Sequence, residues 1–351
     1  MAAFPLTSAI SSEDPLTPDD LAAMQKCYLE HGFCYVRGAV DTACVDDLVE
    51  DLWKQAVVKT SSNWNGLKAG QPRTYPTHWP LLSISLFPDP QPLWRPLVDS
   101  AKLGQALDGL LGGATWEIPQ EKYNVYFPIK LPEPHEKGRR PETCDSLGRP
   151  NKGWHVDLGK NFSDRGLGTS RTIAAGEHHA AVVLFVLSDT EYGEGGTTFL
   201  RGSPRLVADT LKREKDMSHQ ELLNFCNAHV TSKLKSEEFA MPLDEAANQD
   251  PTQPLHAYTG KKGDAIIFHP WAMHAPSRNY SERGEVRFMG NAVVAYKQGA
   301  FKPWFTEETK QDLNVRAASA SPTPSPSPAS PALPASCAPL QAVAGDSGVG
   351  T

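Results

Sequence analysis

The sequence predicts a mainly β domain, a sandwich or barrel, with helices flanking it. Two observations carry this prediction. Segments with helical spacing and helix caps occupy residues 17–112, and short strand-like segments separated by turn residues follow from about 114 to 298. We expect a single domain over residues 17–310 after a flexible N-terminus at 1–16, because 351 residues are enough for one large core.

The predicted helices have recognisable starts and stops. In "TPDDLAAMQKCYLEHG", Thr17 is expected to be the N-cap, Pro18 takes the first helical position and Gly32 ends the helix. "FCYVRG" follows as a strand, and Asp41 caps "TACVDDLVEDLWKQAVV", whose apolar residues have helical spacing. Residues 60–93, rich in Pro, Trp and Ser, predict an ordered loop. "LWRPLVDSAKLGQALDGLLGG" predicts one further helix.

The second half of the chain predicts strands with one helical interruption at about 204–229. The strand candidates are "TWEI", "KYNVYFPI", "GWHVDLG", "HAAVVLFVLS", "TTFLRG", "HAYTG", "DAIIFHP" and "VRFMGNAVVAY". The tail at 316–351 is rich in Ser, Pro and Ala. It is predicted to be disordered, because it cannot bury enough apolar surface to offset its ordering entropy.

Composition argues against several classes of protein. The net charge is −7, so no nucleic-acid partner is expected, and no apolar run is long enough for a membrane span. Six cysteines without a CxxC pair favour a reduced, intracellular chain. The N-terminus lacks the features of a presequence and the C-terminus is not a peroxisomal signal, so we expect a cytoplasmic protein.

One strand candidate carries chemistry on one face. In "GWHVDLG", His155 and Asp157 are two residues apart, so their side chains point the same way and can converge on one ion. A third ligand must come from another strand, and "DAIIFHPWAMH" offers His269 and His274. Two histidines and one carboxylate on one side of a metal form the facial triad of non-haem Fe(II) oxygenases. The Arg that opens the next strand suits a carboxylate ligand.

These segments resemble the phytanoyl-CoA dioxygenase family of Fe(II)/2-oxoglutarate-dependent oxygenases, and most of all a poorly characterised subgroup of it. The matching segments are "HGFCYVRGAV", "GWHVDLG", "EGGTTFLRGSPR" and "GKKGDAIIFHPWAMHAPSRN" with the Arg after it, in the family's order over about residues 20–300. The resemblance implies a double-stranded β-helix core (jelly roll, cupin-like), helices around it, and iron within its mouth.

The resemblance also implies the site residues. His155 and Asp157 match the first two iron ligands. His274 matches the distal ligand, because the family uses the second His of the "HPxxxH" phrase. Arg287 matches the Arg that binds the far carboxylate of 2-oxoglutarate. The separation of His274 and Arg287 is slightly longer than usual in the family, which leaves Arg283 as the alternative anchor.

Finer contacts to 2-oxoglutarate depart from the family's pattern. Pro276 stands where the family often has a Ser, and "LRGSPR" replaces the common "PGSH". We expect Asn124 and Thr198 to supplement the cosubstrate site. The long polar loop at 129–152 is interpreted as a lid over the iron, with plain disorder as the alternative.

The implied activity is hydroxylation of a C–H bond of an unidentified small-molecule or lipid substrate. Fe(II), 2-oxoglutarate and O2 take part, and succinate and CO2 are released. The carboxylate of Asp157 favours hydroxylation over halogenation. Two alternatives stay open: a catalytically silent jelly-roll binding module, and a zinc-dependent hydrolase that uses the same two His and one Asp.

Overall fold

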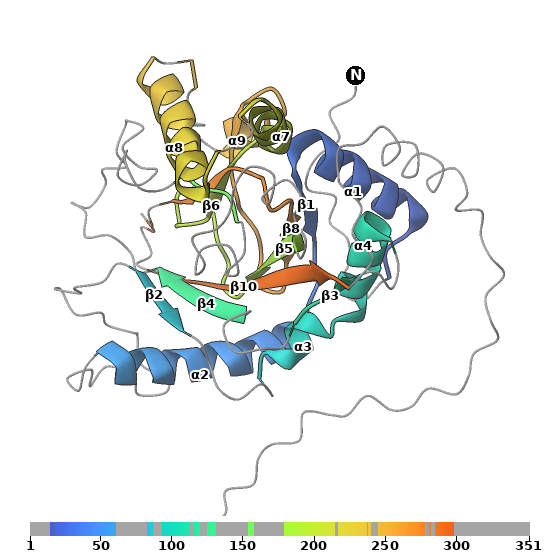
Figure 1. Cartoon of the computed structure of the whole chain (residues 1–351). Coiled ribbons are helices and arrows are strands. Elements are labelled where there is room, and N and C mark those ends of the chain that lie inside the picture. The colour runs from blue at the N-terminus through green and yellow to red at the C-terminus, as the bar shows by residue number, and fades with distance from the viewer. Residues whose placement is uncertain are drawn as a thin grey trace, which may run out of the picture.

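The computed structural model describes residues 15–60, 83–86, 93–112, 116–119, 125–130, 154–157, 179–214, 217–236, 238–239, 245–277, 279, 281 and 285–297 (Figure 1). Three predicted segments fall largely or wholly outside them. These are the flexible N-terminus at 1–16, the lid at 129–152, of which only 129–130 are described, and the disordered tail at 316–351.

The first helix, α1 (Pro18–His31), has the ends that the sequence predicts. The Oγ1 of Thr17 accepts a hydrogen bond from the backbone N–H of Asp20, and the Asp20 carboxylate accepts one from the backbone N–H of Thr17. Gly32 ends the helix in the left-handed conformation, at φ 88°. A Cβ at Gly32 would lie 2.6 Å from Cγ of Pro204, so this position requires glycine for two independent reasons.

The helix predicted near residues 93–113 is in fact two helices, α3 (Arg95–Val98) and α4 (Ala101–Leu111). The break occurs because Ser100 acts as an N-cap: its Oγ accepts a hydrogen bond from Leu103 N–H at 3.3 Å. The same hydroxyl donates to the Ala39 carbonyl, which ties the break to the chain after the first strand.

A large antiparallel sheet forms one wall of the core. Its order is β1 (Phe33–Val36), β8 (Ala265–Phe268), β5 (His179–Val186), β10 (Arg287–Tyr296), β4 (Val125–Lys130) and β2 (Ser83–Leu86), and the short β3 (Trp116–Glu117) also pairs with β10. Strand β2 lies in the segment 60–93, for which the sequence predicts only a loop. It forms because β4 offers a free edge to pair with.

A smaller antiparallel sheet faces the first. Its order is β7 (Leu255–Ala257), β6 (Thr197–Leu200) and β9 (His274–Pro276). Two facing antiparallel sheets with helices outside confirm the predicted mainly β fold with a jelly-roll core. Among the described residues, no helix is long and apolar enough to cross a membrane.

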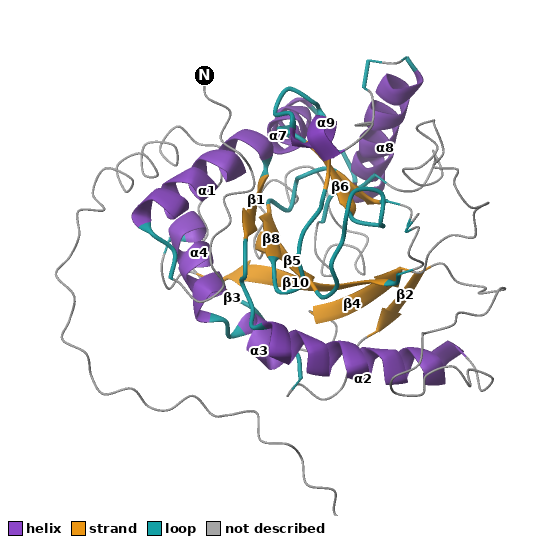
Figure 2. Cartoon of the chain, turned by 180° about the vertical axis from the view of Figure 1, so that it is seen from behind, coloured by secondary structure: helices purple, strands orange, loops and turns teal. Residues whose placement is uncertain are grey.

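Side-chain alternation divides the apolar residues into three layers. The space between the two sheets is filled by a cluster that includes Phe33, Phe199 and Phe268. Outside the large sheet lie α1, α2 (Thr42–Thr60), α3 and α4, where Trp53 of α2 meets Phe288 of β10 edge to face. Figures 1 and 2 show these helices around one side of the barrel and the later helices beside β6.

The helical interruption predicted at about 204–229 consists of two helices, α7 (Ser203–Arg213) and α8 (His219–Lys235), and the short α9 (Glu245–Gln249) follows. The division arises at Ser218, which caps α8 in a box with Glu221. Both α7 and α8 bury apolar residues against the outer face of the small sheet, in a cluster with Leu200 and Leu255.

A buried neutral histidine predicts a loss of stability in acid. His256 on β7 is fully buried. Its Nδ1–H donates to the Asn248 carbonyl at 2.9 Å, and its Nε2 accepts from the Tyr35 hydroxyl at 2.5 Å. Burial, helped by the positive charge of Arg201, lowers the pKa of His256 from 6.5 to about 3. Below about pH 6.5, His256 is therefore protonated in the unfolded chain but stays neutral in the folded chain. The free energy of unfolding consequently falls as the pH falls.

The expected contribution of His256 is about 1.4 kcal/mol per pH unit below pH 6.5. Urea unfolding at pH 7.5, 6.0 and 5.0 measures it. A His256→Gln variant, less stable at pH 7.5, should lose stability less steeply. Parallel slopes for the two proteins would contradict the assignment.

Candidate metal centre

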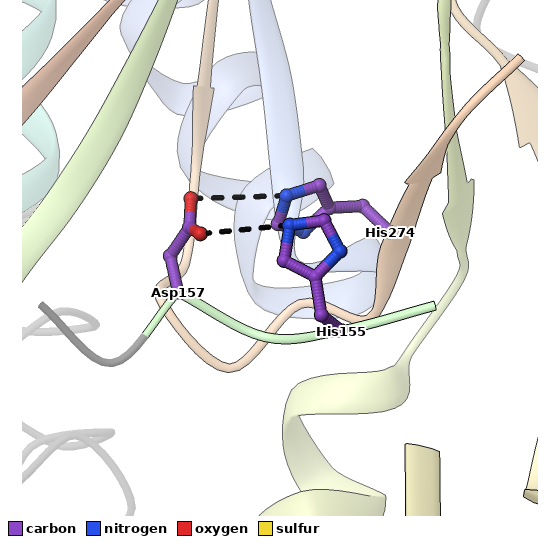
Figure 3. A group of neighbouring side chains, drawn as sticks. All are labelled: His155, Asp157 and His274. Carbon is purple, nitrogen blue, oxygen red and sulfur yellow. Dashed lines mark ion pairs between the residues drawn. The ribbon is translucent and has the colours of Figure 1, made fainter. Parts of the chain in front are cut away.

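The segment Trp154–Asp157 lies at the open edge of the small sheet, beside β9 (Figure 3). The His155 N–H donates to the His274 carbonyl at 3.0 Å, the His274 N–H donates back to the His155 carbonyl at 2.9 Å, and the Asp157 N–H donates to the Pro270 carbonyl at 2.9 Å. The side chains alternate as the sequence predicts: Trp154 and Val156 are buried, whereas His155 and Asp157 point to the other side.

This pairing brings three ligand-type side chains together. Candidate ligand atoms of His155, Asp157 and His274 all lie within 4.8 Å of one another. The Asp157 carboxylate is 3.8 Å from Nε2 of His155 and 3.7 Å from Nε2 of His274, one oxygen facing each ring (Figure 3). Among the described residues, this is the one group of three His, Cys, Asp or Glu side chains close enough to share a metal.

The local structure fixes the tautomer of His274. Its Nδ1 lies 2.9 Å from the carbonyl of Ala272, which can only accept, so Nδ1 carries the proton and the Nε2 lone pair faces Asp157. The ring packs against Phe199 and Phe268 of the interior layer. Burial lowers the pKa of His274 from 6.5 to about 4, and the neighbouring His155 adds to the shift. The imidazole is therefore neutral at pH 7, as a metal ligand must be.

The three side chains differ in access to solvent. The side chain of His274 is 7% exposed, whereas those of Asp157 and His155 are 24% and 40% exposed. The site therefore has a rigid, buried side formed by β9 and an accessible side formed by the edge segment. An ion bound there would be coordinated by His274 on the buried side and would stay accessible to solvent on the side of His155.

The structure separates the two histidines that the sequence offers as a third ligand. His269 follows β8, and its Nδ1 accepts a hydrogen bond from the Trp271 N–H at 2.9 Å. Its ring lies near that of Tyr28 on α1, with ring centroids 6.3 Å apart. A turn in which the Ala272 N–H donates to the His269 carbonyl reverses the chain between the two histidines. Only His274 joins His155 and Asp157.

Arg287 is the first residue of β10 and is only 5% exposed. Along β10, Phe288 packs outward against α2, whereas Met289 belongs to the interior cluster. Because successive residues of a strand alternate, Arg287 faces the interior with Met289. Its backbone pairs with Lys130 of β4. The guanidinium thus enters the same inter-sheet space that His274 borders.

Of the other predicted cosubstrate residues, the structure describes Thr198, which does not join this cluster. Thr198 is fully buried, but its hydroxyl bonds to that of Ser277 at 2.6 Å. It lies next to Phe199 on β6, and Phe199 faces the interior, so Thr198 faces the other side of the small sheet. Asn124 and Arg283 lie outside the described residues.

One residue that sequence reasoning missed holds the edge segment. Asn227 of α8 accepts a hydrogen bond at its Oδ1 from the Trp154 N–H at 3.0 Å, and its Nδ2 donates to the Leu223 carbonyl. It therefore fixes the backbone just before His155. No local pattern marks an Asn in the middle of a helix for this role, because the contact joins residues far apart in sequence.

We expect Asn227→Ala to weaken Mn(II) binding roughly ten-fold, the range in which supporting hydrogen bonds around metal ligands act. Anaerobic calorimetric titration of the full chain measures this. Asn224→Ala is the matched control, because Asn224 is exposed one turn earlier on the same helix. Its Oδ1 accepts a hydrogen bond from the Gln220 Nε2 at 3.1 Å, on the same helix. Equal affinities for the two variants would show that Asn227 does not support the site.

Comparisons with known proteins agree with this geometry. Residues 146–288 match the family model described as phytanoyl-CoA dioxygenase (PhyH). A curated relative, L-proline trans-4-hydroxylase from Streptomyces griseoviridis, is 25% identical over 177 residues, which are 50% of this chain and 56% of that protein. The chain thus spans about half the length of the curated relative it matches.

Two solved structures illustrate the structural similarity. The epimerase SnoN, in complex with Fe3+, alpha ketoglutarate and nogalamycin RO, has 16% identity and a TM-score of 0.47, covering 80% of this chain and 85% of that one. EctD from S. alaskensis, with 2-oxoglutarate and 5-hydroxyectoine, has 16% identity and a TM-score of 0.46, covering 87% and 86%. The segment that matches the phytanoyl-CoA dioxygenase model contains His155, Asp157, His274 and Arg287.

Proposed function

We propose that the protein is an Fe(II)- and 2-oxoglutarate-dependent oxygenase that hydroxylates a C–H bond of a small molecule. The observation that carries the proposal is the convergence of His155, Asp157 and His274, within a segment that matches the phytanoyl-CoA dioxygenase family. In the balanced reaction, 2-oxoglutarate, O2 and a substrate C–H give succinate, CO2 and a C–OH.

The donor set fits Fe(II). Two imidazole nitrogens and one carboxylate are the ligands of the non-haem iron oxygenases, and they leave positions open on the opposite side of the metal. His274 presents an unprotonated Nε2, and Asp157 directs one oxygen to each histidine. When bound, Fe(II) with O2 and 2-oxoglutarate supplies the oxidising power for C–H cleavage.

Metal binding, exclusion of water and cosubstrate binding are the roles of this chain's own residues. His155, Asp157 and His274 would hold the metal at one place, between the edge segment and β9. Phe199 and Phe268 pack against the His274 ring and keep water from its buried side. Arg287, buried and facing the interior, would bind the far carboxylate of 2-oxoglutarate with its planar fork. Together these residues fix both ends of the cosubstrate.

A small-molecule substrate has support from the curated relative, which is named as an L-proline trans-4-hydroxylase. The accessible side of the centre, with the His155 side chain 40% exposed, is where a substrate would approach. A lipid is the alternative class of substrate. Stimulation of turnover by the aqueous fraction of an extract would indicate a small-molecule substrate, and stimulation by the organic fraction would indicate a lipid.

The test is anaerobic purification of the full chain, loading with Fe(II), and measurement of succinate on addition of O2 and 2-oxoglutarate. The expected result is slow succinate formation that a metabolite extract stimulates and that Zn(II) cannot support. Hydrolytic activity with Zn(II) that ignores O2 and 2-oxoglutarate would support a zinc hydrolase instead. Binding of metal and 2-oxoglutarate with no succinate under any extract would support the silent binding module.

A further inference from the structure

The connection between β9 and β10 joins the two ends of the proposed cosubstrate site. Strand β9 begins with His274 and β10 begins with Arg287. Contacts that fix this connection therefore help to position Arg287 relative to the metal centre, in addition to the pairing of Arg287 with Lys130 of β4.

A buried carboxylate from another part of the chain contacts this connection. Glu194, 8% exposed, lies between Gly193 and Gly195, whose φ angles of 84° and 82° form a tight turn before β6. Its Oε2 accepts a hydrogen bond from the Glu191 N–H at 2.9 Å, which anchors the carboxylate to its own turn. Its Oε1 accepts one from the Ser281 hydroxyl at 2.9 Å.

From Ser281, hydrogen bonds lead to the start of β10. The Ser281 Oγ, which donates to Glu194, also accepts from the Glu285 N–H at 3.3 Å. Asn279 completes the arrangement: its Nδ2 donates to the Glu285 carbonyl at 2.8 Å, and its Oδ1 accepts from the Ser281 N–H at 3.0 Å. Asn279 also forms a backbone bridge to Glu194. Glu285, held on both its N–H and its carbonyl, is two residues before Arg287.

We propose that Glu194 is a positioning residue for the cosubstrate: through Ser281 and Glu285 it sets where β10 begins, and so where the Arg287 guanidinium enters the interior. This inference rests on the proposed function, because it assumes that Arg287 binds 2-oxoglutarate. Burial gives the hydrogen bonds to the carboxylate their strength, since no water competes for Glu194, Ser281 or Asn279.

The test is calorimetric titration of 2-oxoglutarate into the full chain loaded with redox-inactive Mn(II). Glu194→Ala should weaken 2-oxoglutarate binding roughly ten-fold and leave the Mn(II) affinity within about two-fold, because small misplacements of a binding group are costly. Ser281→Ala should show the same loss, and the double variant no further loss, since both act through one chain of contacts. Ser281→Ala also carries the test if Glu194→Ala does not fold.

Glu194→Gln should restore most of the affinity. Its amide oxygen can accept from Glu191, and its amide nitrogen can donate to the Ser281 Oγ. Asp264→Ala is the matched control for loss of a buried carboxylate. Asp264 is 4% exposed and binds Arg37 at 2.7 Å and the Gly38 N–H at 2.8 Å, away from the β9–β10 connection.

The control is expected to lower the melting temperature without changing 2-oxoglutarate affinity. If Glu194→Ala and Ser281→Ala behave in the same way as the control, Glu194 is merely structural and the inference is overturned. A wild-type protein that binds Mn(II) but no 2-oxoglutarate would instead overturn the proposed function, which the titration reports before any variant is made.

Discussion

Replacing His274 with alanine is expected to abolish metal-dependent turnover and to weaken Mn(II) or Fe(II) binding by more than about a hundred-fold. Removal of a supporting residue around a metal site costs up to about that much, and loss of a direct ligand must cost more. His274 is also the most buried of the three side chains, and its contact with the Ala272 carbonyl fixes its tautomer. Anaerobic metal titration and succinate formation measure the two effects.

His269→Ala is the matched control. His269 is another buried histidine, at the start of the same "HPWAMH" phrase, but its ring lies toward α1. It should lower stability and leave metal affinity unchanged. If His269→Ala loses the metal while His274→Ala retains it, the distal ligand has been assigned to the wrong histidine.

The alternation of the edge segment could be predicted from the sequence because it depends on the geometry of one strand. The side chains of Trp154 and Val156 are buried while His155 and Asp157 converge, as a period of two requires. The choice between His269 and His274 could not be derived from residues alone, since both follow an apolar strand. The turn at Ala272 places the two histidines on different sides, and the family resemblance implies His274 as the ligand.

What the sequence could not predict depends on contacts between distant segments. The break between α3 and α4 at Ser100 involves the carbonyl of Ala39, and strand β2 forms only because β4 accepts it at an edge. Asn227 and Glu194 resemble ordinary polar residues of a helix and a turn. Their partners lie in other elements, and no periodicity in one sequence reveals such a partner.

Arg287→Lys is expected to weaken 2-oxoglutarate binding by about 1–3 kcal/mol, roughly 5- to 150-fold, and to leave metal binding nearly intact. Lysine keeps the positive charge but loses the planar fork that matches a carboxylate. The measurement is titration of 2-oxoglutarate into the anaerobic Fe(II) protein. Arg283→Lys is the control, because Arg283 is the alternative anchor that the sequence offers four residues before Arg287.

The direction of the Arg287 side chain is the physical basis for this expectation. Phe288 meets Trp53 outside the large sheet, so its neighbour Arg287 must face inward. A guanidinium that faces the interior presents a planar pair of N–H donors, and the far carboxylate of 2-oxoglutarate would match that geometry. If Arg283→Lys weakens 2-oxoglutarate binding while Arg287→Lys does not, the anchor is Arg283. The buried guanidinium of Arg287 then contacts only groups of the protein.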